Sequence, residues 1–291
     1  ASAWRATPGT MAQKLSRGRW QLYRHLNELS IILALAVAGK YPRLIINMPP
    51  QNGKSQLVSH WFPVWFLDHF PELNVLLTSY EADYAAKWGR NVRNTIQANQ
   101  DRLRVRISKD SSAADNWTTT AGGGMSTAGV GGAVTGKPAH CLLIDDPHKN
   151  REQAESETYR EKVWDFYSGT ARERVNPMPW AKFGVIIIMM TRWHTDDLAG
   201  RLISRKVDPE LQAYSLPWTV YKLPAIALEE DPLGRQPGEA LWPERYPLEV
   251  LMSIKADISP YDWEAEYQQS PVRREGALFR REWFWPVDVL A

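Results

Sequence analysis

Four short, largely apolar runs constrain the fold of this 291-residue chain more than any other feature of its sequence. They occupy residues 43–48, 74–79, 140–145 and 183–190, and their apolar residues follow one another instead of alternating with polar ones. Strands that are apolar on both faces belong to parallel sheets covered by helices on each side. Because the stretches between the runs have helical character, the sequence predicts an α/β fold with a mostly parallel central sheet flanked by helices.

Helices and loops are expected between these runs. Apolar residues within 11–40 recur at spacings of three, four or seven, which is typical of one helix face. Further helices are expected at 56–69, 81–97, 152–167 and 196–207. The segment 121–136 is rich in glycine and is expected to be a loop.

The character of the sequence changes at about residue 208. Beyond this point Pro, Trp and Tyr become frequent and regular periodicity fades. We therefore expect a core with an N-terminal helical segment at 1–207 and a lid or linker subdomain packed on that core at 208–270. The last segment, 271–291, is expected to begin a linker to a further domain.

Composition excludes several classes of protein. With 44% hydrophobic and 23% charged residues the chain is expected to be globular and not disordered. Its longest purely apolar run, Ile31–Ala38, is far shorter than the roughly 20 residues that span a bilayer, so no membrane partner is expected. The lone Cys141 cannot form an internal disulfide, which fits a reducing compartment. The net charge of +2 is too small to indicate nucleic-acid binding by itself.

A phosphate-binding loop is predicted between the first apolar run and the helix that follows it. The sequence Met48-Pro-Pro-Gln-Asn-Gly-Lys-Ser55 ends like G-x-x-x-x-G-K-[ST], although Met48 stands where the first glycine is expected. In such a loop Lys54 would reach the outer phosphates of a nucleotide and the Ser55 hydroxyl would hold Mg²⁺. The residues expected to bind the nucleotide are Pro50, Gln51, Asn52, Gly53, Lys54, Ser55 and Gln56.

Two acids end the third apolar run, Cys141-Leu-Leu-Ile-Asp-Asp146. In P-loop enzymes an aspartate at the carboxyl end of a buried strand holds Mg²⁺, so Asp145 is expected to act together with Ser55. Asp146 is then expected to orient or deprotonate the attacking water. The other interpretation is a strand that simply ends in an Asp-Asp-Pro turn, and the phosphate loop earlier in the chain makes it the weaker one.

Polar residues also follow the fourth apolar run, in Met190-Thr-Arg-Trp-His194. Ligands in open α/β sheets bind at the carboxyl ends of strands. Thr191 and Arg192 are therefore expected to sense the γ-phosphate and to couple its loss to movement. The alternative for Arg192 is an ion pair with a surface acid such as Asp196.

These three motifs together resemble the ATPase domain of the large terminase subunit of tailed bacteriophages. The matching residues are Arg43–Ser55, Leu143–Glu152 and Met190–Leu202, they occur in the family's order, and the likeness runs from about residue 20 to the C-terminus. The resemblance implies a RecA-like P-loop fold of the ASCE class, with an extra strand between the two Walker motifs. It also implies hydrolysis of ATP with Mg²⁺ to drive double-stranded viral DNA into a procapsid.

The resemblance assigns roles to individual residues. Lys54 and Ser55 match the Walker A pair, Asp145 the Walker B aspartate, Asp146 the catalytic acid and Thr191 the coupling motif. The catalytic acid of the family is generally a glutamate, which makes Glu152 a fallback for Asp146. Relatives often carry arginine where Gln51 stands, so a cation from a neighbouring subunit gains importance. The candidates for this trans-acting cation are Lys137 and Arg172, and Arg174 ranks below them.

The family also implies partners: double-stranded DNA, a portal protein, a small terminase subunit, and other copies in a ring on the portal. It implies the host-cell cytoplasm as the place of action and a monomer in isolation. DNA could contact the set Lys87, Arg90 and Arg93 on one helix face, the set Arg102, Arg104 and Arg106 on one face of an extended segment, or the glycine-rich loop. Plain surface charge is the alternative for both basic sets.

Two other functions stay open at this point. One is a helicase-like, nucleic-acid-dependent ATPase, and the other is a catalytically weak assembly module that binds the portal and DNA. Family members continue into a nuclease of the ribonuclease H type, and residues 275–284, which Trp285 and Pro286 follow, resemble the junction to it. Because the chain ends at Ala291, no acidic cluster for two-metal cleavage follows, and DNA cleavage by this chain is not expected.

Overall fold

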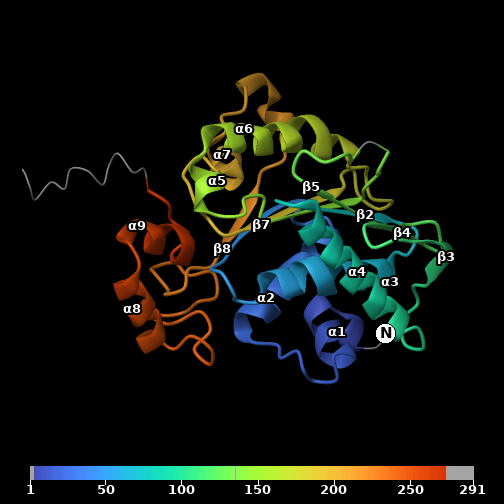
Figure 1. The fold of residues 1–291 in the computed structure, drawn as a ribbon, viewed down its shortest axis with the longest axis horizontal. Helices are drawn as coiled ribbons and strands as arrows, with labels where there is room; N and C mark the ends of the chain where they lie inside the picture. Colours follow the sequence, from blue (N-terminus) through green and yellow to red (C-terminus); the bar gives the residue numbers. More distant parts are fainter. Residues whose placement is uncertain (1–2, 135, 273–291) are drawn as a thin grey trace, which may run out of the picture.

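The computed structural model describes residues 3–134 and 136–272, and an eight-stranded sheet forms its centre (Figure 1). The strand order is β3-β4-β5-β2-β6-β7-β1-β8. Strands β5, β2, β6, β7, β1 and β8 pair in parallel, while β3 and β4 extend one edge in antiparallel fashion. The strands are β1 (Arg43–Asn47), β2 (Asn74–Ser79), β3 (Ile107–Ser112), β4 (Asn116–Thr119), β5 (Gly124–Gly129), β6 (Cys141–Asp145), β7 (Val185–Met190) and β8 (Thr219–Lys222).

Helices cover both faces of the sheet (Figure 1). Helices α1 to α4 lie on one face and α5 to α7 on the other. The α-helices are α1 (Pro8–Leu15), α2 (Arg24–Val37), α3 (Phe62–His69), α4 (Ala82–Ala98), α5 (Arg151–Glu155), α6 (Glu157–Phe166), α7 (Leu198–Ser204), α8 (Leu248–Asp257) and α9 (Pro260–Asp262). The shorter helical elements are η1 (Ala3–Arg5), η2 (Gln56–Trp61), η3 (Tyr167–Ala171), η4 (Arg172–Arg174), η5 (Pro209–Tyr214) and η6 (Trp263–Tyr267).

The apolar strands supply two separate cores. Successive side chains of a strand point to opposite faces of the sheet, so Leu44 and Ile46 of β1 pack under α1–α4 while Ile45 packs under α6 and α7. Each of these side chains is fully buried. This two-sided burial is what an uninterrupted apolar run requires, and the predicted α/β fold with a mostly parallel sheet is confirmed.

Strand β7 lies between β1 and β6, which carry the phosphate loop and the paired aspartates. Its register places Met190 beside Asn47 and Met189 beside Asp145. The carboxyl ends of the three strands therefore meet at one edge of the sheet. This is the extra strand between the two Walker motifs that the family resemblance implies, and it is confirmed.

The single helix expected at 11–40 is wrong, because the chain forms α1 and α2 with a turn between them. Arg17 and Gly18 adopt φ of +56° and +80°, a left-handed conformation that ends a helix. The Gly18 amide donates to the carbonyl of Gln13 at 3.1 Å, which closes α1. The helix expected at 152–167 is likewise divided, because Ser156 leaves helical geometry and its hydroxyl caps α6 at Tyr159.

The glycine-rich segment 121–136 is not only a loop, because it contains β5 inside the sheet. Glycine is rare in strands, but here it allows close approach of the neighbouring strand. A Cβ atom added to Gly124 would lie 2.2 Å from the carbonyl oxygen of Trp117 on β4. Strand β8 was also not expected, since it lies within 208–270, and it pairs with β1 at the other end of the sheet.

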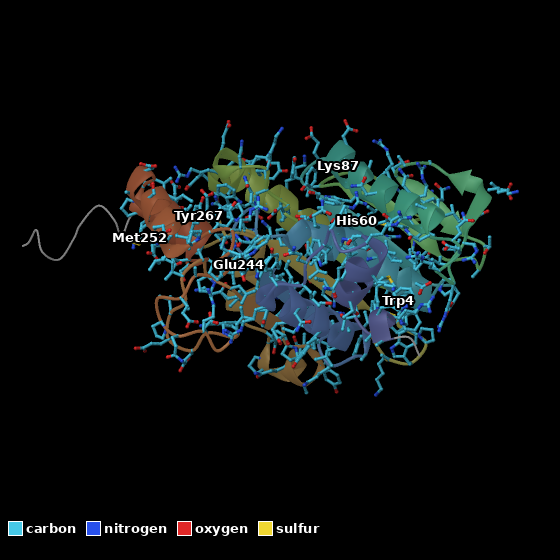
Figure 2. All side chains as sticks on the ribbon, turned by 90° about the horizontal axis from the view of Figure 1, so that it is seen from below. Trp4, His60, Lys87, Glu244, Met252 and Tyr267 are labelled. Atoms are coloured by element: carbon cyan, nitrogen blue, oxygen red, sulfur yellow. The ribbon has the colours of Figure 1, made fainter. Side chains whose placement is uncertain are left out.

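A third, smaller hydrophobic cluster lies in the C-terminal part of the described chain. Ala225, Leu251 and Trp263 are its buried members. In Figure 1, α8 and α9 stand beside the sheet and not on either face, and Figure 2 places Met252 and Tyr267 at the end of the molecule away from Trp4. The boundary at 207/208 stays a proposal, and most of the segment expected at 271–291 lies outside the described residues.

Within 3–134 and 136–272, no helix combines the length and the apolar character that crossing a bilayer requires.

Candidate nucleotide-binding site

The loop between β1 and η2 has the backbone shape of a phosphate cradle. Gln51 and Gly53 adopt φ of +59° and +84°, in the left-handed region that favours glycine. A Cβ atom on Gly53 would also approach the Leu26 side chain to 3.2 Å. The Asn52 amide group donates to the carbonyl of Pro50 at 2.9 Å and holds the loop from within. The loop then runs directly into the helical segment η2–α3, whose first amides point towards it.

His25 fastens this loop to α2. Its Nε2 lies 3.1 Å from the carbonyl oxygen of Asn52 and donates to it. The side chain is 1% exposed. Burial lowers the pKa of His25 to about 4, although the hydrogen bond to Asn52 acts in the opposite direction. The imidazole is therefore neutral at neutral pH and serves as a fixed donor.

We expect the stability of the protein to fall as the pH drops from about 6.5 towards about 4, in part because of His25. Between these pH values the His25 imidazole binds a proton in the unfolded chain but stays neutral in the folded chain, so protonation favours unfolding. The effect amounts to roughly 1–2 kcal/mol at about pH 5. Urea unfolding of the unmodified chain and of His25→Gln at about pH 7.5 and pH 5 measures it. The variant should lose less stability between the two pH values, and an equal loss in both proteins contradicts the assignment.

Lys54, Asp146 and Thr191 meet in one hydrogen-bonded group at the carboxyl edge of the sheet. Lys54 Nζ donates to Thr191 Oγ1 at 2.8 Å and lies 3.4 Å from Asp146 Oδ2. The Thr191 amide donates to Asp146 Oδ1 at 2.8 Å. The structure thus brings together three residues from three different predicted motifs. Asp146 contacts Lys54 through Oδ2 and the Thr191 amide through Oδ1.

Asp145 lies beneath this group and is 1% exposed. Its two oxygens accept hydrogen bonds from Ser55 Oγ at 3.2 Å and from Ser59 Oγ at 2.7 Å. Burial, followed by the neighbouring charge of Asp146, raises the pKa of Asp145. A bound cation would relieve this cost, and a hydroxyl beside a carboxylate suits the oxygen preference of Mg²⁺. Ser55 and Asp145 therefore fit the ion that the sequence predicts for them; Ser59, one helical turn after Ser55, was not foreseen.

A cleft of about 470 Å³ opens above these groups. Asp146, Thr191 and the residues of the phosphate loop that are expected to bind the nucleotide, other than Asn52, line it. Their role in binding nucleotide stays a prediction. Further lining residues were not singled out from the sequence: Tyr80, Tyr84, His148, Lys149, Trp193 and Arg245. Most of them follow the ends of β2, β6 and β7, so the rule that ligands bind at carboxyl ends of strands could have indicated them. Arg245 comes from the irregular region after residue 208, where no periodic signal exists.

Arg192 lies away from the lining of the cleft. Its Nε is 2.9 and 3.0 Å from the two carboxylate oxygens of Asp197, which is fully buried. Asp197 also caps α7 by accepting from the Gly200 amide at 2.8 Å. The surface acid Asp196, considered as a partner from the sequence, pairs instead with Arg160 and Arg201. The sensing role of Arg192 stays a prediction, and its position shows a structural role at the base of the coupling motif.

The remaining acid and the candidate trans-acting cations also lie outside the cleft lining. Glu152 is exposed in the first turn of α5. Lys137 Nζ donates to the carbonyl of Thr127 on β5 at 3.0 Å. Arg172 is exposed in η4, and its charge acts on Arg43 at the amino end of β1, the edge of the sheet opposite the cleft. Their proposed roles stay predictions.

The residues of the two basic sets are exposed, except for Arg93, which is half-buried on α4. Lys87 and Arg90 are exposed on α4, and Figure 2 shows Lys87 at the periphery of the molecule. Arg102, Arg104 and Arg106 are exposed while Leu103 and Val105 between them are buried, although the strand β3 begins only at Ile107. Exposure permits contact with DNA phosphates but does not distinguish it from ordinary surface charge.

Comparison with known proteins gives a consistent result. The family model described as "Terminase large subunit, T4likevirus-type, N-terminal" matches residues 45–285. No curated protein is detectably similar to the chain in sequence. The large terminase of bacteriophage HK97 superposes with a TM-score of 0.50 at 13% identity, over 82% of this chain and 49% of that one. A variant of the ATPase domain of the Thermus phage P74-26 large terminase gives 0.50 at 13% identity, over 91% of this chain and 100% of that one.

These matches cover different shares of the chain and of the similar proteins. The chain spans about half the length of the HK97 protein and the whole of the P74-26 ATPase domain. At 13% identity the superpositions concern the fold alone. The family match covers most of the chain and contains the phosphate loop, both aspartates and the Thr191 motif.

Proposed function

Because the chain belongs to the family of T4-like terminase large subunits, on a match that covers residues 45–285, we propose that it hydrolyses ATP with Mg²⁺ and that this hydrolysis drives double-stranded viral DNA into a procapsid. The observation that carries the proposal is the meeting of Lys54, Asp146 and Thr191 in the lining of one cleft, next to the Ser55–Asp145 pair. A phosphate-binding cation, a metal-binding pair and a carboxylate that can accept from water are the groups that phosphoryl transfer to water requires.

The roles of the chain's own groups follow from their positions. Lys54 stabilises negative charge on the β- and γ-phosphates, and in doing so its ammonium group leaves Asp146 Oδ2. That oxygen is then available to orient the attacking water, while Oδ1 stays on the Thr191 amide. Ser55 and Asp145 would hold Mg²⁺, and the ion would supply further stabilisation of negative charge during phosphoryl transfer. Asp146 therefore links the reacting water to Thr191, which follows β7 and begins the coupling motif.

The partners that we propose are those of the family: double-stranded DNA, a portal, a small terminase subunit, and further copies of this chain in a ring. A trans-acting cation from the neighbouring copy would complete the site, because Gln51 supplies no positive charge to it. Lys137 and Arg172 are the candidates, since both lie outside the lining of their own cleft. We propose that the isolated chain is monomeric and acts in the cytoplasm of the host cell.

The proposal assigns the catalytic acid to Asp146 and not to Glu152. Asp146→Asn is expected to lower single-turnover phosphate release by about 100-fold or more, because general-base help from a positioned carboxylate has that magnitude. Glu152→Gln should change release by less than about threefold, since this exposed side chain does not line the cleft. Affinity for a non-hydrolysable ATP analogue serves as the control and should stay similar in both variants. The reverse pattern of release rates would show that Glu152 is the acid.

A further inference from the structure

His148 differs from the other residues around the cleft because neither of its ring nitrogens has a hydrogen-bond partner in the described part of the chain. Its side chain is 2% exposed, and it forms part of the lining of the cleft. Both ring nitrogens, Nδ1 and Nε2, are buried and have no hydrogen-bond partner among the residues that the structure describes. Buried polar groups in folded proteins are nearly always hydrogen-bonded, and an exception at a ligand cleft points to a partner that comes with the ligand.

The surroundings keep the imidazole in place and uncharged. Its ring packs 5.7 Å from the ring of Tyr159 on α6, centre to centre. Burial lowers the pKa of His148 to about 4, with the charge of Asp197 opposing the shift. A neutral imidazole offers one donor and one acceptor nitrogen. His25, which is equally buried, differs in that its Nε2 is already used by the phosphate loop.

His148 lies close to Asp146 in the chain, so its unpaired ring nitrogens could bind the same water as the Asp146 carboxylate. The two residues are separated only by Pro147, and Asp146 itself adopts a left-handed φ of +42°. One Asp146 oxygen is occupied by the Thr191 amide, so the carboxylate has only Oδ2 left for water once Lys54 has moved to the phosphates. A single oxygen does not fix the direction from which a water approaches phosphorus, whereas two hydrogen-bonding groups do.

We propose that His148 is a second water-positioning residue of this ATPase. Its ring nitrogens are covered in this structure; when nucleotide fills the cleft one of them becomes accessible and accepts a hydrogen bond from the attacking water, while Asp146 Oδ2 accepts the other. The water oxygen bonds to the γ-phosphorus, and the bond from that phosphorus to the β–γ bridging oxygen breaks. ADP leaves with the bridging electron pair. The proton of the water passes to Asp146 and then to the released phosphate, so His148 gains no net proton. The inference rests on the proposed ATPase function.

The test uses the whole chain with three changes at this position. His148→Phe keeps a ring against Tyr159 and removes both nitrogens, while His148→Gln and His148→Asn each keep one acceptor at a different reach. His140→Phe is the matched control, because it makes the same change just before the amino end of β6, where the ring accepts a hydrogen bond from the Asn74 amide at 3.1 Å. Three quantities are measured: single-turnover phosphate release, affinity for ADP, and affinity for ADP with aluminium fluoride, which mimics the transferring phosphoryl group and its in-line water.

His148→Phe is expected to slow phosphate release by about 10- to 100-fold and to weaken binding of the aluminium fluoride complex by a similar factor, with ADP affinity unchanged. One of the amide variants should recover part of the loss. Release within about twofold of the unmodified chain, or an equal loss of affinity for ADP and for its aluminium fluoride complex, would overturn the proposal. If the unmodified chain releases no more phosphate than Lys54→Ala, the ATPase function itself fails and takes this proposal with it.

Discussion

Asp197→Ala is expected to destabilise the protein by about 3–5 kcal/mol, because it leaves the buried Arg192 guanidinium without its partner. The carboxylate is fully buried, accepts from Arg192 at 2.9 Å, and caps α7 through the Gly200 amide. Its loss removes an ion pair and a helix cap at the base of the coupling motif. The free energy of unfolding from urea titration measures the effect.

The neighbouring acid provides a matched control for this prediction. Asp196→Ala also removes a carboxylate with two arginine partners, but the side chain is 45% exposed. Exposed ion pairs contribute about 0–1 kcal/mol, so this variant should unfold at nearly the same urea concentration as the unmodified chain. Equal destabilisation by the two changes would contradict the view that the Arg192–Asp197 pair contributes more to the free energy of unfolding because it is buried.

Lys54→Ala is expected to have the largest effect on activity. Removal of one preorganised charge donor from a site of phosphoryl transfer costs about 100- to 1,000-fold in rate. Lys54 Nζ is also the group that contacts both Thr191 and Asp146, so its loss should weaken nucleotide binding as well. Single-turnover phosphate release and titration with a fluorescent ATP analogue measure the two effects.

A lysine far from the cleft separates this effect from a general loss of positive charge. Lys109→Ala changes an exposed residue of β3, at the outer edge of the sheet. It should leave phosphate release within about twofold of the unmodified chain. A similar fall in both variants would mean that Lys54 acts through overall charge and does not contact phosphate.

The sequence predicts those parts of the fold and site that local patterns encode. The apolar runs were sufficient to place β1, β2, β6 and β7, because a strand buried on both faces has no polar alternation. The phosphate loop and the Asp145–Asp146 pair follow from their places at the ends of such strands. Their convergence was predictable too, since the carboxyl ends of parallel strands share one edge of a sheet.

The features that sequence patterns missed depend on contacts between distant segments. Strand β5 begins and ends with glycine, which is explained by the close approach of Trp117 on β4 to Gly124 and of the Glu81–Ala82 backbone to Gly129. Arg192 pairs with Asp197 and not with the neighbouring Asp196, because Asp197 is buried as the cap of α7. Arg245 reaches the cleft from a region without periodicity, and His148 is recognisable only once its two unsatisfied nitrogens are seen.

The most direct test of the account is phosphate release from ATP by the unmodified chain, with and without Mg²⁺ and with duplex DNA added. We expect turnover that requires Mg²⁺ and that clearly exceeds the release by Lys54→Ala under the same conditions. If the chain binds ATP but releases no phosphate, even when it is concentrated together with duplex DNA, it is an assembly module and not a motor.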